Sequence, residues 1–172
     1  MEFAPLIIAF VTIIFVLTHF FKRGGNSKGR SRKSENGNRI SNGSLALLSK
    51  PPAFHWQDGA NFDFEVVGES FYQPQLSALV GSTGGEWVEV PHVATLVPED
   101  DNIHDKNAVA IYIGSMQVGY LSRDDAQSFR RRLGAKKISG QPTTCDAIIK
   151  GGGTVNGKVA SFGVWLDMKP FG

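Results

Sequence analysis

The stretch PEDDNIHDKNAVAIYIGSMQVGYL, residues 98–121, decides the fold of this chain. It begins with a polar loop, 99–106, that holds four acids and one histidine. Residues 108–113, AVAIYI, then place their side chains alternately on two faces, which is the pattern of a strand. Gly114 and Ser115 predict a tight turn into a second strand, 116–121. The stretch therefore predicts a β-hairpin whose polar loop is either a solvated turn or a binding site.

The remaining elements of the folded part are short. The same patterns predict a strand over 62–67, a helix over 71–80, a strand over 87–97, a helix that Ser122 caps and Gly134 ends, and a closing hairpin of 143–150 and 159–168. Pro91 within the third of these elements indicates a sheet edge or a bulge. Short strands with turn signals and two short helices predict a mostly β fold, a small barrel rather than a parallel sheet.

Several motifs in this part resemble the HIRAN domain family. Asn102-x-x-Asp105-x-Asn107-Ala108-Val109 is followed by Val118-Gly119-Tyr120-Leu121 and a helix. Upstream, Phe64 to Gly68 and the pair Phe71-Tyr72 look like the first strand and aromatic pair of that family. The similarity covers about residues 62–168. It implies an OB-like β-barrel with two helices, and the best understood members bind the 3′ end of single-stranded DNA.

The resemblance also implies a site. Phe71 and Tyr72 would stack on the terminal bases, and Asp105 would accept a hydrogen bond from the 3′-hydroxyl. Asn102, His104 and Tyr120 match neighbouring contact positions.

Two departures and two alternatives bear on this site. Ser70 stands where DNA-binding relatives carry an arginine, and Asp100 and Asp101 add negative charge. One or both rings of the aromatic pair could instead pack under the helix, and Asp105 with Asn107 could serve only the backbone of their own loop.

The charges of the chain, a formal net +2, are distributed unevenly. Residues 1–35 hold six of the 18 Lys and Arg residues and two of the 16 Asp and Glu residues. The other twelve cations and fourteen anions give residues 36–172 a net charge of −2, which is not the overall signature of a nucleic-acid binder. The single cysteine, Cys145, excludes an internal disulfide, fits a reducing compartment, and is expected to be a packed thiol in a strand.

Three segments are expected along the chain. Residues 1–23 are a transmembrane anchor, because the run 4–21 has no charge and would span roughly 27 Å as a helix. Six Lys and Arg residues follow that run within 22–33 and none precedes it, so the positive-inside rule predicts a single-pass cell-membrane protein with a cytoplasmic C-terminal domain. Residues 24–53 are expected to be a basic, flexible tether, and 54–172 the barrel domain.

Three other motifs fail the residue pattern that their chemistry requires. Residues 152–158 fit G-x-x-x-x-G-K, but Val159 replaces the required Ser or Thr and a strand follows, so Asn156-Gly157 predicts a hairpin turn. The acidic loop fails the calcium-loop pattern, and a zinc site would need His92 to join His104. No catalytic triad motif is present in the sequence.

The sequence therefore predicts a membrane-anchored module that binds a single-stranded DNA end or another nucleic acid. It is expected to be no enzyme and to need no cofactor, metal or small-molecule substrate. A tethered protein-interaction module, with an unknown protein partner, is the alternative, and a metal-dependent hydrolase is a weaker one. A basic groove from Arg123 and Arg130–Lys137 to Tyr72 would favour nucleic acid, acidic potential around Asp105 a protein partner, and clustered His92, His104 and Asp105 a hydrolase.

Overall fold

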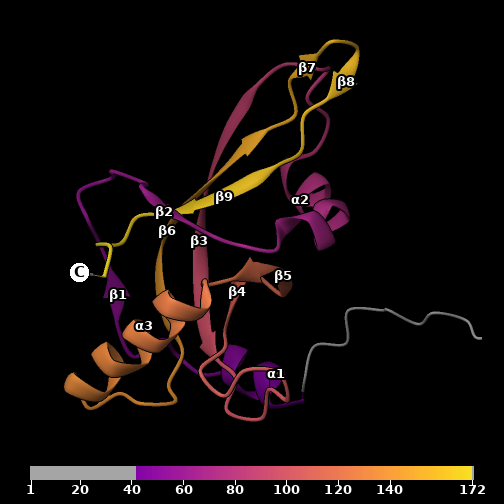
Figure 1. Ribbon diagram of the computed structural model, residues 1–172. Helices are drawn as coiled ribbons and strands as arrows, with labels where there is room; N and C mark the ends of the chain where they lie inside the picture. Colours follow the sequence, from indigo (N-terminus) through magenta and orange to yellow (C-terminus); the bar gives the residue numbers. More distant parts are fainter. Residues whose placement is uncertain (1–41, 172) are drawn as a thin grey trace, which may run out of the picture. The chain divides into compact units, whose positions relative to one another are not determined.

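The computed structural model describes residues 42–171, and β-strands of unequal length make up most of its regular structure (Figure 1). In chain order the elements are α1 (Asn42–Leu48), β1 (His55–Trp56), β2 (Phe64–Glu65), the 3-10 helix η1 (Glu69–Phe71), α2 (Gln73–Val80), β3 (Val88–Pro98), β4 (Val109–Ile113), β5 (Met116–Tyr120), α3 (Arg123–Ala135), β6 (Thr143–Gly151), β7 (Thr154–Val155), β8 (Lys158–Val159) and β9 (Gly163–Leu166). The prediction of a mostly β fold is confirmed, with three α-helices in this part of the chain rather than two.

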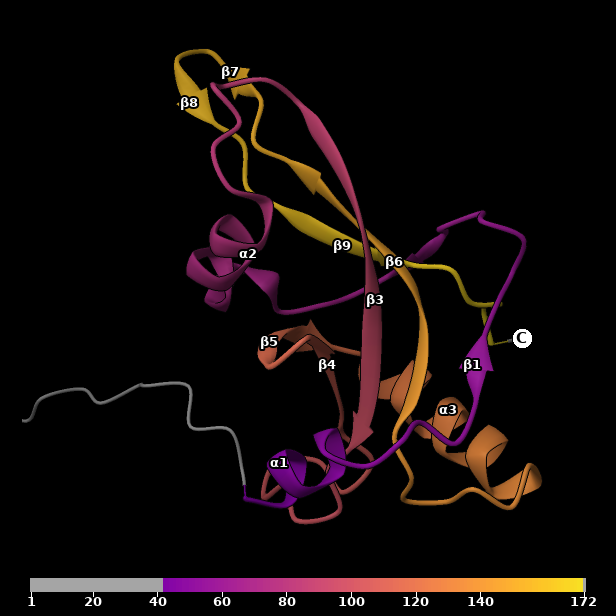
Figure 2. The same cartoon turned by 180° about the vertical axis from the view of Figure 1, so that it is seen from behind.

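The main sheet follows the order β2-β9-β6-β3-β4-β5, with β1 added in parallel beside β6. Its long strands β3 and β6 run antiparallel and bend together, as both views show (Figures 1 and 2). Just beyond β2, Val67 pairs with Tyr120 at the end of β5 through two backbone hydrogen bonds of 2.8 and 2.9 Å. The two ends of this strand order, β2 and β5, thus meet, and the curled sheet is consistent with an OB-like fold.

Gly119 allows this meeting. A Cβ atom at position 119 would lie 2.4 Å from Cγ1 of Val66 and 2.8 Å from the carbonyl oxygen of Val67. No side chain larger than hydrogen fits between the two strands at that point, because heavy atoms do not approach so closely. The glycine inside the sequence Val118-Gly119-Tyr120 therefore positions Tyr120, one of the expected site residues, against the other edge of the sheet.

The hairpin predicted from residues 108–121 is present. β4 pairs with β5 across the turn at Gly114, whose φ is 59°. Val109, Ile111 and Ile113 enter the main core, whereas Ala110 and Tyr112 pack with Val97 in a second cluster on the other face. Both faces of β4 are buried, which explains why its sequence has no polar side.

Two helices match the predictions closely. The hydroxyl of Ser122 caps α3 by accepting from the backbone N–H of Asp125 at 3.2 Å. Ala126, Phe129 and Leu133 form the buried stripe of α3, and Leu76 is the buried residue of α2. The helix α3 passes Gly134 and ends at Ala135, and Lys137 rather than the glycine adopts positive φ, at 59°.

The helix α1 lies within the segment that was expected to be a flexible tether. Its Ser44 is buried, and Leu47 and Leu48 pack against the second cluster beneath Tyr112. Folded structure therefore begins by Asn42 instead of near residue 54. The apolar side chains of Leu47 and Leu48, both half-buried, supply the contact that holds this helix on the domain.

The closing hairpin is present as β6 and β9, with the smaller hairpin β7–β8 in its connection. Asn156 and Gly157 have φ values of 51° and 75°, so this segment is a turn between strands and not a phosphate loop. Pro91 lies in the half of β3 that pairs with β6 alone, because β4 pairs only with Ala94 to Pro98. The proline therefore lies on a local sheet edge, as expected.

The expected anchor and the first part of the tether lie outside the described residues. Within 42–171, no helix is long and apolar enough to cross a bilayer.

Candidate functional site

The loop between β3 and β4 is held in shape by its own side chains. Asn102 Oδ1 accepts from the backbone N–H groups of His104 and Asp105, at 2.9 and 3.1 Å. Asp105 Oδ1 accepts from the backbone N–H of Asn107 at 2.8 Å, and Glu99 closes the loop through a backbone bond to Ala108. Asp105 and Asn107 therefore take part in the backbone hydrogen bonding of their own loop, as the alternative to a binding role predicted. Asp105 Oδ2 has no hydrogen-bond partner among the described residues.

Glu99 is a buried acid, 7% exposed, that anchors this loop to its surroundings. Its Oε1 accepts from the Ser44 hydroxyl of α1 at 2.8 Å. Its Oε2 accepts from Asn102 Nδ2 at 2.9 Å and, more weakly, from the Tyr120 hydroxyl at 3.4 Å. A buried carboxylate needs such donors to offset its desolvation. Glu99 thereby holds the side chains of two expected site residues, Asn102 and Tyr120, in place through hydrogen bonds from its buried carboxylate.

An open cavity of about 270 Å³ lies beside this network. Its lining residues are Asn102, His104, Asp105, Ala108, Tyr120, Leu121 and Arg123. Four of the six expected site residues thus meet at one place. Arg123, which the sequence suggested only as part of a basic groove, brings the cation of this lining. Arg123 directly follows Leu121-Ser122. Its position just after the Gly-Tyr-Leu motif is the sequence signal that could have indicated it as a site residue.

The aromatic pair does not form a two-ring platform. Phe71 is 78% exposed, but Tyr72 is only 7% exposed and has no open ring face. Burial raises the pKa of Tyr72, and the neighbouring Tyr120 hydroxyl adds to the rise. Burial likewise raises the pKa of Tyr120. Tyr72 therefore lies buried beside Tyr120. Of the aromatic pair, only Phe71 presents its ring to solvent, on a 3-10 helix beside β5.

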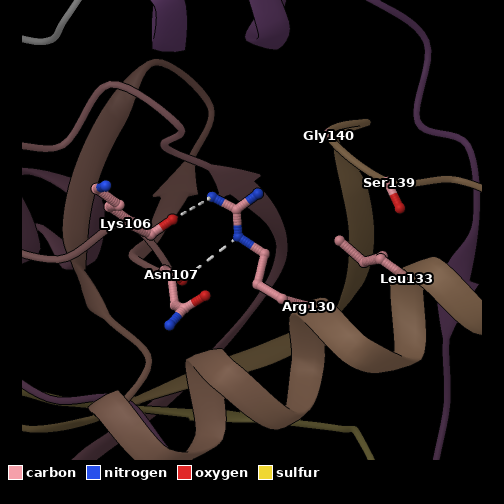
Figure 3. Close-up of a pocket in the computed structure, with 6 residues that line it drawn as sticks. All are labelled: Lys106, Asn107, Arg130, Leu133, Ser139 and Gly140. Atoms are coloured by element: carbon pink, nitrogen blue, oxygen red, sulfur yellow. Dashed lines mark hydrogen bonds between the residues drawn. The ribbon is translucent and has the colours of Figure 1, made fainter.

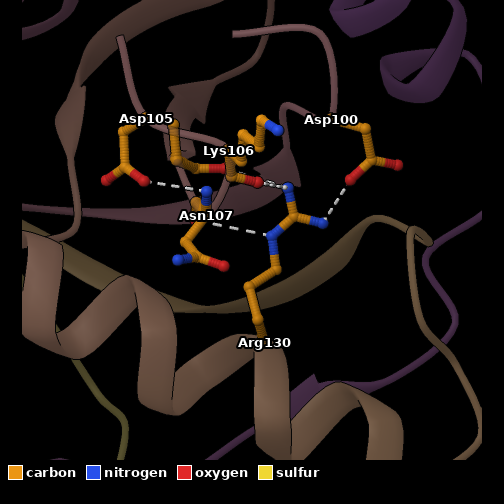
Figure 4. Close-up of polar contacts among 6 residues, drawn as sticks. Asp100, Asp105, Lys106, Asn107 and Arg130 are labelled. Carbon is orange, nitrogen blue, oxygen red and sulfur yellow. Dashed lines mark hydrogen bonds and ion pairs between the residues drawn. The ribbon is translucent and has the colours of Figure 1, made fainter.

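Arg130 of α3 is bound to the same loop from the opposite side (Figure 4). Its Nη1 lies 2.6 Å from Asp100 Oδ1, and its other nitrogens reach the carbonyl oxygens of Lys106, Asn107 and Ala108 at 3.4 Å. Its side chain is only 16% exposed, whereas that of Asp100 is 75% exposed. Arg130 thus neutralises Asp100, so that Asp101 remains the unpaired acid of the pair expected to repel a phosphate.

A second, smaller cavity of about 180 Å³ lies between Arg130, Leu133 and the residues Ser139 and Gly140 (Figure 3). Lys106 and Asn107 complete its lining. A continuous basic groove from Arg123 and Arg130–Lys137 to Tyr72, the feature that would favour nucleic acid, is not formed, because Arg130 is bound to the loop and Tyr72 is buried.

The residues of the hydrolase alternative lie apart. His92 lines a different cavity, of about 410 Å³, with Phe62, Pro91, Val93, Asp146 and Ala147, whereas His104 and Asp105 line the pocket described above. Burial lowers the pKa of His92. Among residues 42–171, no three His, Cys, Asp or Glu side chains are grouped so as to hold a metal ion. Cys145 is buried, and burial raises the pKa of its thiol, as expected of a packed cysteine.

A curled β-sheet with a polar pocket at one rim is the architecture of a small binding module of OB type. The chain belongs to the HIRAN domain family, whose family model matches residues 60–146. The HIRAN domain is a nucleic-acid-binding domain. Neither a curated protein nor a solved structure matched the chain.

Proposed function

We propose that the pocket binds the 3′ end of single-stranded DNA. The observation that carries the proposal is the cavity itself, because it brings Asn102, His104 and Asp105 of one loop together with Tyr120 of the next strand. These positions are the ones that the family resemblance assigns to end binding.

The chemistry of the pocket fits a free end. Asp105 Oδ1 is engaged by its loop, and Oδ2 is left to accept a hydrogen bond from a 3′-hydroxyl. A carboxylate repels a terminal phosphate at the same place, which gives the preference for a free end. Arg123 offers one phosphate contact, and the exposed ring of Phe71 offers stacking, in general about 1–3 kcal/mol per base.

The test compares strands with a 3′-hydroxyl and with a 3′-phosphate, by fluorescence anisotropy on the full-length chain. Asp105→Asn is the informative variant, because its Oδ1 still accepts from Asn107 while its outer atom becomes an N–H donor. We expect Asp105→Asn to lose the preference for the free hydroxyl. Asp101→Asn removes the same charge from the same loop, on an exposed residue, and should keep the preference.

If the parent chain does not distinguish the two strands, or if Asp105→Asn still distinguishes them, the end-binding proposal is wrong. A module that binds a protein partner through the same acidic loop would then take its place.

We also propose that residues 4–21 anchor the chain in the cell membrane with the HIRAN domain in the cytoplasm. The uncharged run and the six basic residues after it support this orientation. The full chain should resist extraction from membranes by alkaline carbonate, and protease added to intact cells should leave its domain uncut. Extraction, or cleavage from outside, would contradict the anchor or its orientation.

A further inference from the structure

The flank of α3 that faces β1 carries cations and aromatic rings in alternation. We call this surface the basic flank and define it by Phe54, Arg132, Lys136, Lys169 and Phe171. The ammonium group of Lys136 lies 4.0 Å from the centre of the Phe54 ring, and the guanidinium of Arg132 lies 4.3 Å from the centre of the Phe171 ring. Figures 1 and 2 both show α3, β1 and the last described residues side by side.

The cations of the basic flank keep their charge unneutralised. Among residues 42–171, none of its three cations lies within ion-pair distance of a carboxylate, although the domain as a whole is acidic. Two acids lie close to β1, Asp58 in the segment that follows it and Asp146 on the paired strand β6, and both are otherwise engaged. Asp146 faces His55 at 3.8 Å, and Asp58 contacts Asn61 at 3.4 Å. The flank is therefore a local positive surface on a negative domain.

Helix geometry separates this surface from the pocket. Arg123 and Arg130 are seven residues apart and share the face of α3 that meets the 99–107 loop. Arg132 and Lys136 are four residues apart and lie on the other side of the buried stripe formed by Ala126, Phe129 and Leu133. The basic flank is thus a separate surface and not an extension of the pocket.

We propose that the basic flank is a second nucleic-acid contact, which binds the sugar-phosphate backbone of a single strand away from its end. Proteins that bind single strands without regard to sequence combine a positive surface with aromatic side chains for base stacking. The guanidinium of Arg132 donates from Nη1 to the carbonyl oxygen of Lys169 at 3.3 Å, and its other N–H groups can meet a phosphate. Phe54 is 38% exposed and can take an adjacent base once Lys136 moves to a phosphate.

An anionic membrane surface is the competing partner. Interfacial binding requires apolar side chains that project beyond the cations into the bilayer. In the basic flank the order is reversed, because the cations lie over the rings and Trp56 beneath them is only 6% exposed. Nucleic acid is therefore the partner that this arrangement fits.

The test uses the full-length chain and strands of about 12 nucleotides whose 3′ ends carry phosphate, so that the pocket does not contribute. The double variant Arg132→Gln, Lys136→Gln removes the two cations that lie over the rings. We expect its affinity to fall several-fold and the slope of log affinity against log salt to shrink by about 1.4. Arg132→Lys with Lys136→Arg conserves the charges and should bind like the parent, as should Lys158→Gln on the distant β8.

Unchanged affinity and salt slope in the double Gln variant would overturn the proposal. A membrane partner would overturn it as well. In that case vesicles containing phosphatidylserine, but not plain phosphatidylcholine vesicles, would displace the strand from the parent and from Lys158→Gln, and the double Gln variant would still bind DNA normally. Because the strands are blocked at the 3′ end, this result does not depend on the fate of Asp105→Asn.

Discussion

The two flanks of α3 use the same kind of side chain in opposite ways. We call the side of α3 that meets the 99–107 loop the loop flank. There Arg130 is 16% exposed, paired with Asp100, and bonded to three carbonyl oxygens. On the basic flank, Arg132 lies over Phe171 and has no carboxylate partner among the described residues. Arg130 therefore acts as a structural brace, whereas the charge of Arg132, which donates to one carbonyl oxygen, that of Lys169, is not neutralised by a carboxylate of the described residues. The comparison shows that the location of the counter-charge, rather than the number of basic residues, decides which arginine can meet a ligand.

The largest expected effect concerns the network that the loop flank protects. Glu99→Gln removes one of two acceptor oxygens from a buried site with three donors, Ser44, Asn102 and Tyr120. We expect the free energy of unfolding to fall by about 2–3 kcal/mol, since buried groups would lose their partners. Urea unfolding followed by tryptophan fluorescence measures it. Glu89→Gln, at an exposed ion pair with Lys150, should cost less than about 1 kcal/mol.

Arg130→Met tests the brace itself. The variant keeps much of the apolar stem but loses Asp100 and the loop carbonyls, so we expect a loss of about 1–2 kcal/mol in unfolding free energy. Faster hydrogen exchange at the 99–107 amides should accompany it. Asp100→Asn should cost much less, because that side chain is 75% exposed. Equal losses in the two variants would show that the ion pair, and not the carbonyl bonds, holds the loop.

The pH dependence of the free energy of unfolding provides a third way to compare the flanks, because the buried tyrosines lie on the side of the loop. Burial raises the pKa of Tyr112 from 10.0 to about 12, so the folded chain holds this proton after the unfolded chain has released it. The contribution of Tyr112 is complete below pH 10 and falls as the pH rises toward 12, by about 1 kcal/mol near pH 11.

Denaturant titrations between pH 9 and pH 11 measure this slope. Tyr112→Phe should flatten it, and a part should remain because the pKa of Tyr72 is raised as well. An identical slope in Tyr112→Phe and the parent would contradict the assignment.

The smallest expected effect is on the basic flank. Arg132→Met should lower the unfolding free energy by less than about 1 kcal/mol, because a cation–π contact at a partly exposed site contributes little. Thermal unfolding at matched ionic strength measures it. A loss as large as that of Arg130→Met would mean that both flanks are structural and would remove the contrast between them.

Local patterns in the sequence predicted the local parts of the fold. The alternation over 108–113, the turn at Gly114, the Ser122 cap and the Asn156-Gly157 turn each depend on neighbouring residues, and each is present. The parts that were missed depend on distant partners. β1 has two residues and exists because β6 lies beside it, and α1 is held by Glu99, which is 55 residues from Ser44.

The same distinction applies to the site. Four expected residues meet in the pocket because one loop and one strand carry them. The burial of Tyr72 could not be read from the sequence, since Phe71 and Tyr72 are adjacent aromatics and only the packing of α2 against β5 decides which one faces inward. The engagement of Arg130 by Asp100 likewise joins residues 30 positions apart.

The hydrogen bond between Ser44 and Glu99 has a consequence for where this domain ends. The family match covers 60–146, whereas Ser44, the strand β1 and the strand β9 all lie beyond it and all bond to residues within it. The packed unit that the structure describes is therefore larger than the matched segment. A mutation or cut near residue 44, in a segment that sequence comparison assigns to no domain, would be transmitted through one buried carboxylate to Asn102 and Tyr120 at the pocket.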